Sequence, residues 1–387
     1  MRIGLFTDTY YPEINGVATS VYTLFENLCA LGHDVHVFAP KCKGYEQVEG
    51  DCIHFLPSVP VPVLKDRNLG MYGPFSIVDM VKYQFDVVHT NSEFSMGMLG
   101  KIVGREIGCA RVHTYHTVWE DYVYYVTHGV ADDAARSLAR KYSSFWCNRF
   151  EAVIAPTLKT QRLLETYGVT SPIHVIPSGL EIGRFAPQLH DDALRTRIRE
   201  ECGVKAGERV LLYLGRIAKE KNLDQVLRVF PRLRERCPDV RLVIVGEGPL
   251  IPSLREQAAA LGVDDFVSFP GPKPWKEIDN YYAMGDVFVS ASHSETQGLT
   301  YIEAMASGLC VVAYDDPCLE GVIASGENGL LFADDDDAML EMLARGFSEE
   351  GRVIAARAPE SVARYAPINF ARAVEKVYEK VVSEHKD

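Results

Sequence analysis

Two glutamates in the stretch "SHSETQGLTYIEAMASG", residues 292–308, have the types and spacing of a ligand site. Glu295 precedes a predicted helix and Glu303 lies in its second turn. Carboxylates in these places can accept hydrogen bonds from sugar hydroxyls. The alternative for Glu303 is an exposed helical glutamate, but its apolar neighbours in "YIEAMA" would make an unpaired carboxylate costly there.

The turn between these glutamates has the features of an anion site. Gly298 allows the backbone to approach a ligand closely. The N–H groups of Gly298, Leu299 and Thr300 begin the predicted helix, where amides lack helical partners and the helix dipole is positive. We therefore expect this turn to bind a diphosphate.

Two cations follow another predicted strand, in "YLGRIAKEKNLD" (213–224). Gly215 ends the strand, and Arg216 and Lys221 lie on the loop and the next helix start. Placed at the carboxyl edge of a sheet, they can neutralise a leaving diphosphate. Cations near a loop are usually solvated, and it is the neighbouring anion site that favours a functional interpretation.

The third candidate is His116, in "HTYHTVWEDYVYYVTHG" (113–129). A single histidine is more often structural than catalytic, so both interpretations stay open. The candidates for holding an acceptor hydroxyl are Tyr11, Glu120, Asp121 and Tyr122, although the two acids can equally cap a helix.

The elements that must position these residues alternate in a regular way. Short apolar runs alternate with amphipathic helices, first over Arg2–Phe6, Val17–Leu31, Val35–Phe38, 85–90 and 152–157, and again from 209–215 to 309–314. This pattern predicts an α/β protein of two Rossmann-like parallel-sheet domains that face a central cleft. We expect the domains to span 1–185 and 186–366, with a linker over 180–193 and a C-terminal helix, 367–387, that packs back on the first domain.

The bulk properties limit the class of function. A formal net charge of −13 over 387 residues argues against a nucleic-acid partner. The nine cysteines contain no C-x-x-C pair, no metal cluster is apparent, and no apolar run is long enough to span a membrane. We therefore expect a cytoplasmic protein without a catalytic cofactor or metal.

These motifs together resemble the family 4 retaining glycosyltransferases of the GT-B fold. The resemblance rests on "GRIAKEKNLD" with "ETQGLTYIE", and extends from "FTDTYYPEINGVATSV" through "IPSGLEIGRF" to "GENGLLF". Within the family, "TNSEFSMGMLG" followed by "TYHTVWEDYVYY" is most similar to the bacterial diacylglycerol α-glucosyltransferases.

The resemblance implies roles for individual residues. Gly16 is expected near the donor phosphates and the acceptor, and Arg216 and Lys221 at the diphosphate. Glu303 is expected to accept the ribose hydroxyls, while Glu295 and the amides after it hold the hexose. His116 is expected beside the 6-hydroxyl of the sugar and the reacting centre.

The implied reaction is transfer of glucose from UDP-glucose, as co-substrate, to diacylglycerol, giving α-monoglucosyldiacylglycerol. The donor nucleotide remains open between UDP and GDP, and the sugar between glucose, galactose and mannose. The acceptor can be a lipid or a soluble saccharide, and the oligomeric state is also open. A lipid acceptor implies a peripheral protein on the inner face of the cell membrane. Segment 133–164, with six basic and two acidic residues, is the candidate anionic-membrane surface, against the alternative of an ordinary core helix.

Three other classes compete with this interpretation. A dehydrogenase also has two nucleotide-binding halves, but "TDTYYPEING" follows the first strand in place of G-x-G-x-x-G. A GT-B epimerase would break the same kind of bond with water as the acceptor. A protein that only binds nucleotide sugars would not need the full set of Arg216, Lys221, Glu295 and Glu303.

Overall fold

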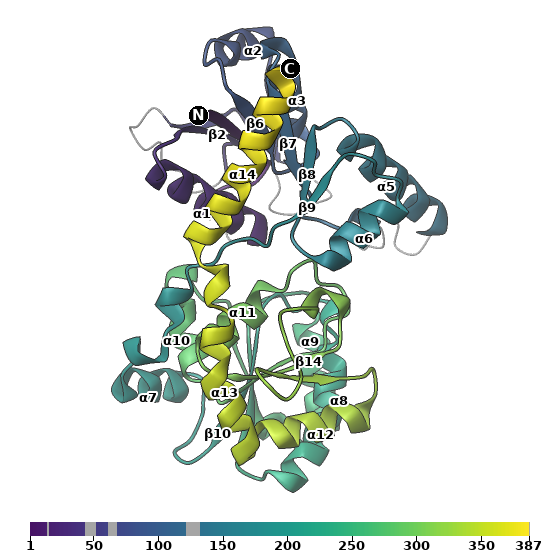
Figure 1. Cartoon of the computed structure of the whole chain (residues 1–387). Coiled ribbons are helices and arrows are strands. Elements are labelled where there is room, and N and C mark those ends of the chain that lie inside the picture. Colours follow the sequence, from purple (N-terminus) through teal and green to yellow (C-terminus); the bar gives the residue numbers. More distant parts are fainter. Residues whose placement is uncertain (14, 43–51, 61–67, 121–131, 387) are drawn as a thin grey trace. The chain divides into compact units, whose positions relative to one another are not determined.

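The computed structural model describes residues 1–13, 15–42, 52–60, 68–120 and 132–386. The chain forms two compact units, one of Met1–Leu180 with Pro367–Asp387 and the other of Glu181–Ala366. Each contains one large parallel sheet with helices (Figure 1). The predicted fold class, α/β with two Rossmann-like sheets, is therefore confirmed.

The first unit is built on a seven-stranded sheet in the order β3-β2-β1-β6-β7-β8-β9. Every printed pairing within it is parallel, because each strand returns through a crossover segment. The strands are β1 (Arg2–Phe6), β2 (Asp34–Pro40), β3 (Ile53–Leu56), β6 (Val87–Thr90), β7 (Ala110–Thr114), β8 (Ala152–Ala155) and β9 (Ile173–Val175). A separate antiparallel pair joins β4 (Ser58–Pro60) to β5 (Asn68–Gly70).

Helices cover this sheet, and one of them comes from the far end of the chain. The helices are α1 (Gly16–Ala30), α2 (Pro74–Val81), α3 (Ser95–Ile107), α5 (Asp132–Cys147), α6 (Leu158–Thr166) and α14 (Pro367–Lys386). The apolar stripe of α14 includes Phe370, Val374 and Tyr378, which are buried in one core with β1 and α1. Burial of this stripe attaches the C-terminal helix to the N-terminal sheet (Figure 1).

The second unit is built on a six-stranded parallel sheet in the order β12-β11-β10-β13-β14-β15. The strands are β10 (Arg209–Leu214), β11 (Val240–Val245), β12 (Val267–Gly271), β13 (Val287–Ser290), β14 (Cys310–Tyr314) and β15 (Leu330–Phe332). The helices are α7 (Asp192–Glu201), α8 (Leu223–Arg236), α9 (Ile251–Ala260), α10 (Ile278–Ala283), α11 (Leu299–Ala306), α12 (Asp336–Gly346) and α13 (Glu349–Ser361). The central strands are buried along their length, as expected of a sheet with both faces covered.

Residues 180–193, predicted as a linker, are mostly folded. The short helical turns η1 (Ile182–Phe185) and η2 (Pro187–Leu189) pack within the second unit. Arg184 donates to Asp279 at 2.5 Å and to the Trp275 carbonyl at 2.9 Å, and Phe185 is 1% exposed. The boundary between the two units, at Leu180 and Glu181, lies within the predicted linker, and the rest of that segment is ordered by partners about ninety residues away in the sequence.

Segment 133–164, the candidate membrane surface, contains both exposed and buried parts. It contains the buried strand β8, and Trp146 of α5 is fully buried. The outer face of α5 is exposed, with Leu138 at 68% and Phe145 at 52%, and Leu158 at the start of α6 is 39% exposed. Among the described helices, none has the length and apolarity that a membrane span requires.

Candidate active site

An ion pair joins two of the predicted site residues at the carboxyl edge of the second sheet. Lys221 ends the short turn η3 (Lys219–Lys221) after β10, and Glu295 lies between β13 and α11. Lys221 Nζ lies 2.5 Å from Glu295 Oε1, and each side chain is 16% exposed. Asn222, with φ of 49°, donates from Nδ2 to the Ala291 carbonyl at 3.0 Å and so links the same two loops. The sheet thus places a cation and a carboxylate together although they lie far apart in the sequence.

Arg216 lies on the loop that leads from β10 to this pair. Its side chain is 47% exposed and contacts Glu220. The buried Tyr213 hydroxyl donates to the Arg216 carbonyl at 2.7 Å, which fixes the backbone of the loop while the guanidinium remains accessible. Arg216 is therefore positioned to reach an anion above the strand ends.

Glycines allow the loop after β11 to pack closely on this one. A Cβ on Gly246 would lie 1.9 Å from the Gly215 carbonyl oxygen, and one on Gly248 would lie 2.0 Å from that of Ile217. The Ile217 amide donates to the Glu247 carbonyl at 2.7 Å. The sequence reasoning missed these residues, although "VGEGP" directly after an apolar strand was a signal that could have found them.

The start of α11 has the geometry expected of an anion site. Gly298 is the N-cap residue in the left-handed conformation, with φ of 71°, and has no side chain with which to cap the helix. A Cβ at this position would lie 2.3 Å from the Tyr301 ring. Leu299 and Thr300 form the first turn and are partly exposed. The first amides of α11 therefore have no N-cap side chain to which they can donate a hydrogen bond.

Glu303 lies further along α11 in a buried environment. The Tyr282 hydroxyl of α10 donates to Glu303 Oε2 at 2.6 Å. Burial raises the pKa of Glu303 to about 7, against the hydrogen bond from Tyr282 and the charge of Arg184, which both lower it. Neither Tyr282 nor Arg184 was predicted as a site residue, since Tyr282 belongs to no quoted motif and Arg184, although it lies in "IPSGLEIGRF", was given no role. A carboxyl group with a pKa near neutral pH can ionise there, and the resulting carboxylate can accept hydrogen bonds from ligand hydroxyls.

The remaining predicted residues lie in the first unit, and His116 is the best defined of them. It follows β7, and its Nε2 lies 3.1 Å from Asn91 Oδ1. Burial and the nearby His113 lower the pKa of His116 to about 3, so the ring is neutral at physiological pH. With Asn91 Oδ1 as acceptor, Nε2 carries the hydrogen and Nδ1 remains an acceptor.

Gly16 is the first residue of α1 and is exposed. Asn15 caps this helix, because its Oδ1 accepts from the Val17 amide at 3.1 Å and from the Ala18 amide at 3.0 Å. Two of the helix-start amides expected to face a ligand are therefore already hydrogen-bonded.

The acceptor candidates are not gathered into one cluster by the described residues. Tyr11 is 48% exposed, beside the Tyr22 ring. Glu120 accepts from Arg140 Nε at 2.5 Å, so its carboxylate is held by α5. Asp121 and Tyr122 lie outside the described residues. Within the described ranges no group of three or more His, Cys, Asp or Glu side chains could hold a metal ion.

Two protein-family models match the chain, Glycosyltransferase Family 4 over residues 14–184 and Glycosyl transferases group 1 over residues 195–359. The chain is 39% identical over 348 residues to the alpha-monoglucosyldiacylglycerol synthase of Streptococcus pneumoniae, covering 89% of this chain and 78% of that protein. It is 31% identical over 385 residues to the synthase of the same name from Acholeplasma laidlawii, covering 98% and 96%. A GDP-mannose-dependent alpha-mannosyltransferase of Mycobacterium tuberculosis is 28% identical over 340 residues, covering 86% and 83%.

Solved structures share the fold at low sequence identity. Anabaena HepE, solved with UDP and glucose, superposes with a TM-score of 0.77 at 16% identity, covering 98% of this chain and 100% of that one. The sucrose-phosphate synthase of Thermosynechococcus elongatus gives a TM-score of 0.75 at 21% identity and covers 99% of both chains.

Proposed function

This chain belongs to the family 4 glycosyltransferases, and from that premise we propose that it transfers glucose from UDP-glucose to diacylglycerol with retention of configuration, forming α-monoglucosyldiacylglycerol. Two relatives that bear the name alpha-monoglucosyldiacylglycerol synthase, at 39% and 31% identity over most of the chain, support this choice of substrates. The general activity, glycosyl transfer, follows from the family itself.

The single observation that carries the mechanism is the Lys221–Glu295 pair at 2.5 Å beside the uncapped start of α11. Breaking the anomeric bond places negative charge on the leaving diphosphate. Lys221, Arg216 and the first amides of α11 supply positive charge and hydrogen-bond donors at one sheet edge. Glu295 holds the lysine ammonium in place and, in this proposal, also accepts a hydrogen bond from a hexose hydroxyl. The site is thus prepared for charge that develops as the bond breaks.

Glu303 completes the donor site in this proposal by accepting the ribose hydroxyls of UDP. Its carboxylate is buried, and Tyr282 donates to one oxygen, which leaves further acceptor capacity on the carboxylate. Each carboxylate of the site is therefore committed to a neighbouring side chain. For this reason we assign neither Glu295 nor Glu303 as a covalent nucleophile, a role that would require a carboxylate about 5 Å from its acid–base partner across the reacting bond.

The proposed chemical step is attack by the acceptor hydroxyl on the same face from which the diphosphate leaves. The departing phosphate oxygen takes the proton of that hydroxyl, so that the new glycosidic bond forms as the bond between the anomeric carbon and the diphosphate oxygen breaks. His116 contributes hydrogen bonds rather than charge, since its lowered pKa keeps the ring neutral. Stabilisation of the leaving group therefore rests on Arg216, Lys221 and the helix amides.

A lipid acceptor requires that the first unit contact a membrane, and we propose the outer face of α5 for that contact. Leu138 and Phe145 are seven residues apart and both exposed, with the exposed Lys141 between them. The Arg149 guanidinium lies 3.3 Å from the centre of the Phe145 ring, so that a cation accompanies the exposed aromatic side chain. An apolar strip with basic neighbours is typical of a helix that lies in a membrane interface. In this proposal the enzyme is peripheral, on the inner face of the cell membrane.

The decisive test is a transfer assay with UDP-glucose, UDP-galactose, GDP-glucose and GDP-mannose over vesicles with and without diacylglycerol. We expect α-glucosyl-diacylglycerol as the product, and a transfer rate with UDP-glucose at least tenfold above the rate with any other donor. The product anomer is assigned by NMR. Preferential use of GDP-mannose, or transfer that does not depend on diacylglycerol, would refute the proposed substrates while leaving the family intact.

A further inference from the structure

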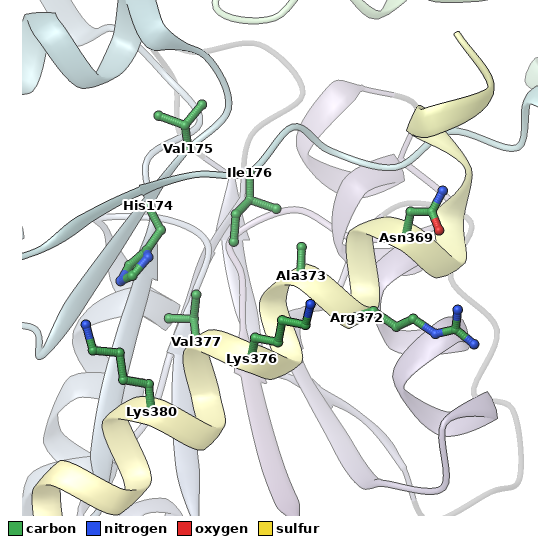
Figure 2. A pocket seen from close by; sticks show the side chains of 9 residues that line it. All are labelled: His174, Val175, Ile176, Asn369, Arg372, Ala373, Lys376, Val377 and Lys380. Atoms are coloured by element: carbon green, nitrogen blue, oxygen red, sulfur yellow. The ribbon is translucent and has the colours of Figure 1, made fainter. Parts of the chain in front are cut away.

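A basic groove lies in the first unit, and none of its lining residues is assigned to sugar transfer. It runs between the edge strand β9 and helix α14 and has a cavity volume of about 560 Å³. Figure 2 shows its lining side chains, which come from these two elements alone. Arg372, Lys376 and Lys380 lie along α14 at intervals of four residues, so they share one face of the helix.

These cations have little neutralising charge. Arg372 and Lys376 form no ion pair or side-chain hydrogen bond with any described residue, and Lys380 reaches Glu384 only at 4.0 Å. Glu375 of the same helix is held elsewhere, by a 2.8 Å contact with His33. Like charges at this spacing repel one another along a helix.

A second helix of the chain shows how the same pattern is neutralised. Helix α8 also carries three arginines at intervals of four residues, and each contacts an acidic residue of α12. The pairs are Arg228–Asp336 at 2.7 Å, Arg232–Asp337 at 2.6 Å and Arg236–Glu341 at 3.0 Å. Among the residues that the structure describes, no acidic side chain of another helix forms an ion pair with Arg372, Lys376 or Lys380 of α14, although the whole chain has a net charge of −13. The fold therefore leaves this one stripe available to an external anion.

The wall opposite the stripe adds polar and apolar contacts. His174 of β9 has a buried Nε2 without a hydrogen-bond partner among the described residues. Its ring and the Lys380 ammonium lie at the same end of the groove, on facing elements (Figure 2). Burial and the charge of Lys380 lower the pKa of His174. Ile176, directly after β9, and Val377 of α14 supply an apolar floor (Figure 2). An anion with an organic substituent would contact all of these groups.

We propose that this groove between β9 and α14 binds a phosphate ester. The lysines act as point charges for phosphate oxygens, and Arg372 offers a planar fork of donors. Three positions four residues apart span about 12 Å along a helix, which matches a phosphate with its esterified group rather than one small ion. The ligand is either a phospholipid headgroup or a soluble phosphate ester. The proposal does not depend on sugar transfer, because binding is measured without a sugar donor.

The test compares two double variants of the full chain that remove equal charge. The groove variant is Lys376→Gln with Lys380→Gln, and the matched control on α8 is Arg232→Gln with Arg236→Gln. Glycerol 3-phosphate, titrated by calorimetry, probes a soluble ester. Co-sedimentation with phosphatidylcholine vesicles, with and without phosphatidylglycerol, probes a headgroup. Thermal unfolding establishes that both variants are folded.

We expect the groove variant to bind at least one probe tenfold or more weakly, and the control to stay within twofold of wild type. Loss with glycerol 3-phosphate identifies a soluble ester as a ligand, and loss confined to phosphatidylglycerol vesicles identifies a headgroup. The proposal is overturned if the wild type binds neither probe, if the groove variant keeps its affinity for both, or if both variants lose affinity equally.

Discussion

Replacing Glu303 by glutamine should make the protein more stable and a poorer binder of the sugar donor. The carboxyl is buried, and burial raises its pKa from the ordinary 4.5 to about 7. At neutral pH and above, the folded protein therefore bears the cost of an ionised group in a poorly solvated place. Glutamine has nearly the same shape, can accept the 2.6 Å hydrogen bond from Tyr282, and carries no charge.

The size and sign of the effect follow from the two pKa values. A difference of about 2.5 pKa units corresponds to about 3 kcal/mol, as an upper figure. Below pH 4.5 the carboxyl of Glu303 is protonated in both the folded and the unfolded chain, so Glu303→Gln changes stability little. Between pH 4.5 and about 7 the unfolded chain releases the proton and the folded chain keeps it, so wild-type stability falls as pH rises. Above pH 7 the stability gain of the variant is complete.

The assay is thermal unfolding of wild type and Glu303→Gln from pH 4.5 to 8.5. A gain of about 3 kcal/mol corresponds to roughly 6–12 °C for a unit of this size. Glu256→Gln, at an exposed position of α9, is the control for loss of one carboxylate. In the same variant, loss of charged hydrogen bonds to the ribose should weaken UDP-glucose binding about tenfold or more. A melting-temperature difference that does not change with pH would refute the assigned pKa. Unchanged donor affinity would refute the assigned ribose contact.

Three further predictions concern the same site. Lys221→Met should lower kcat by about 10²–10³-fold, as expected for loss of one transition-state donor, whereas Arg228→Met on α8 should leave steady-state rates within twofold. Gly298→Ala should cost about 1–2 kcal/mol of stability, because φ is 71° and the new Cβ meets the Tyr301 ring; thermal unfolding and the KM for UDP-glucose would both register it, and unchanged values would contradict the strained turn. The kcat/KM profiles of wild type and His116→Gln should run parallel from pH 5 to 9, because His116 is already neutral there; profiles that diverge near pH 6.5 would contradict this.

The fold could be predicted from the sequence because each strand is a short, locally complete signal. The runs Arg2–Phe6 and Arg209–Leu214 both form buried parallel strands. A short apolar run followed by an amphipathic helix predicts such a strand even when its neighbouring strands are unknown. The helical turns at residues 182–189, within the predicted linker, could not be predicted in this way. Arg184 and Phe185 are ordered by distant side chains, and no local pattern reports such contacts.

The residue types of the candidate site could be predicted from the sequence, whereas the ion pairs and hydrogen bonds between those residues could not. Lys221 and Glu295 were found because each follows a strand close to a glycine, but their ion pair joins positions 74 residues apart in the sequence. Tyr282 could not have been found in this way, since a tyrosine in a short helix has many structural roles. Its importance is evident only from the hydrogen bond that it donates to Glu303.

The two basic helices show why charge in particular resists prediction from sequence. Helices α8 and α14 both repeat a cation every fourth residue, and as sequences both read as a solvated helix face. In the fold, α12 lies beside α8 and neutralises it, whereas the edge strand β9, with a histidine and apolar residues, lies beside α14. What decides between a structural charge and a binding charge is therefore the neighbouring element. The same argument applies to Glu303, where burial against Tyr282, rather than the motif, sets the pKa on which donor binding would depend.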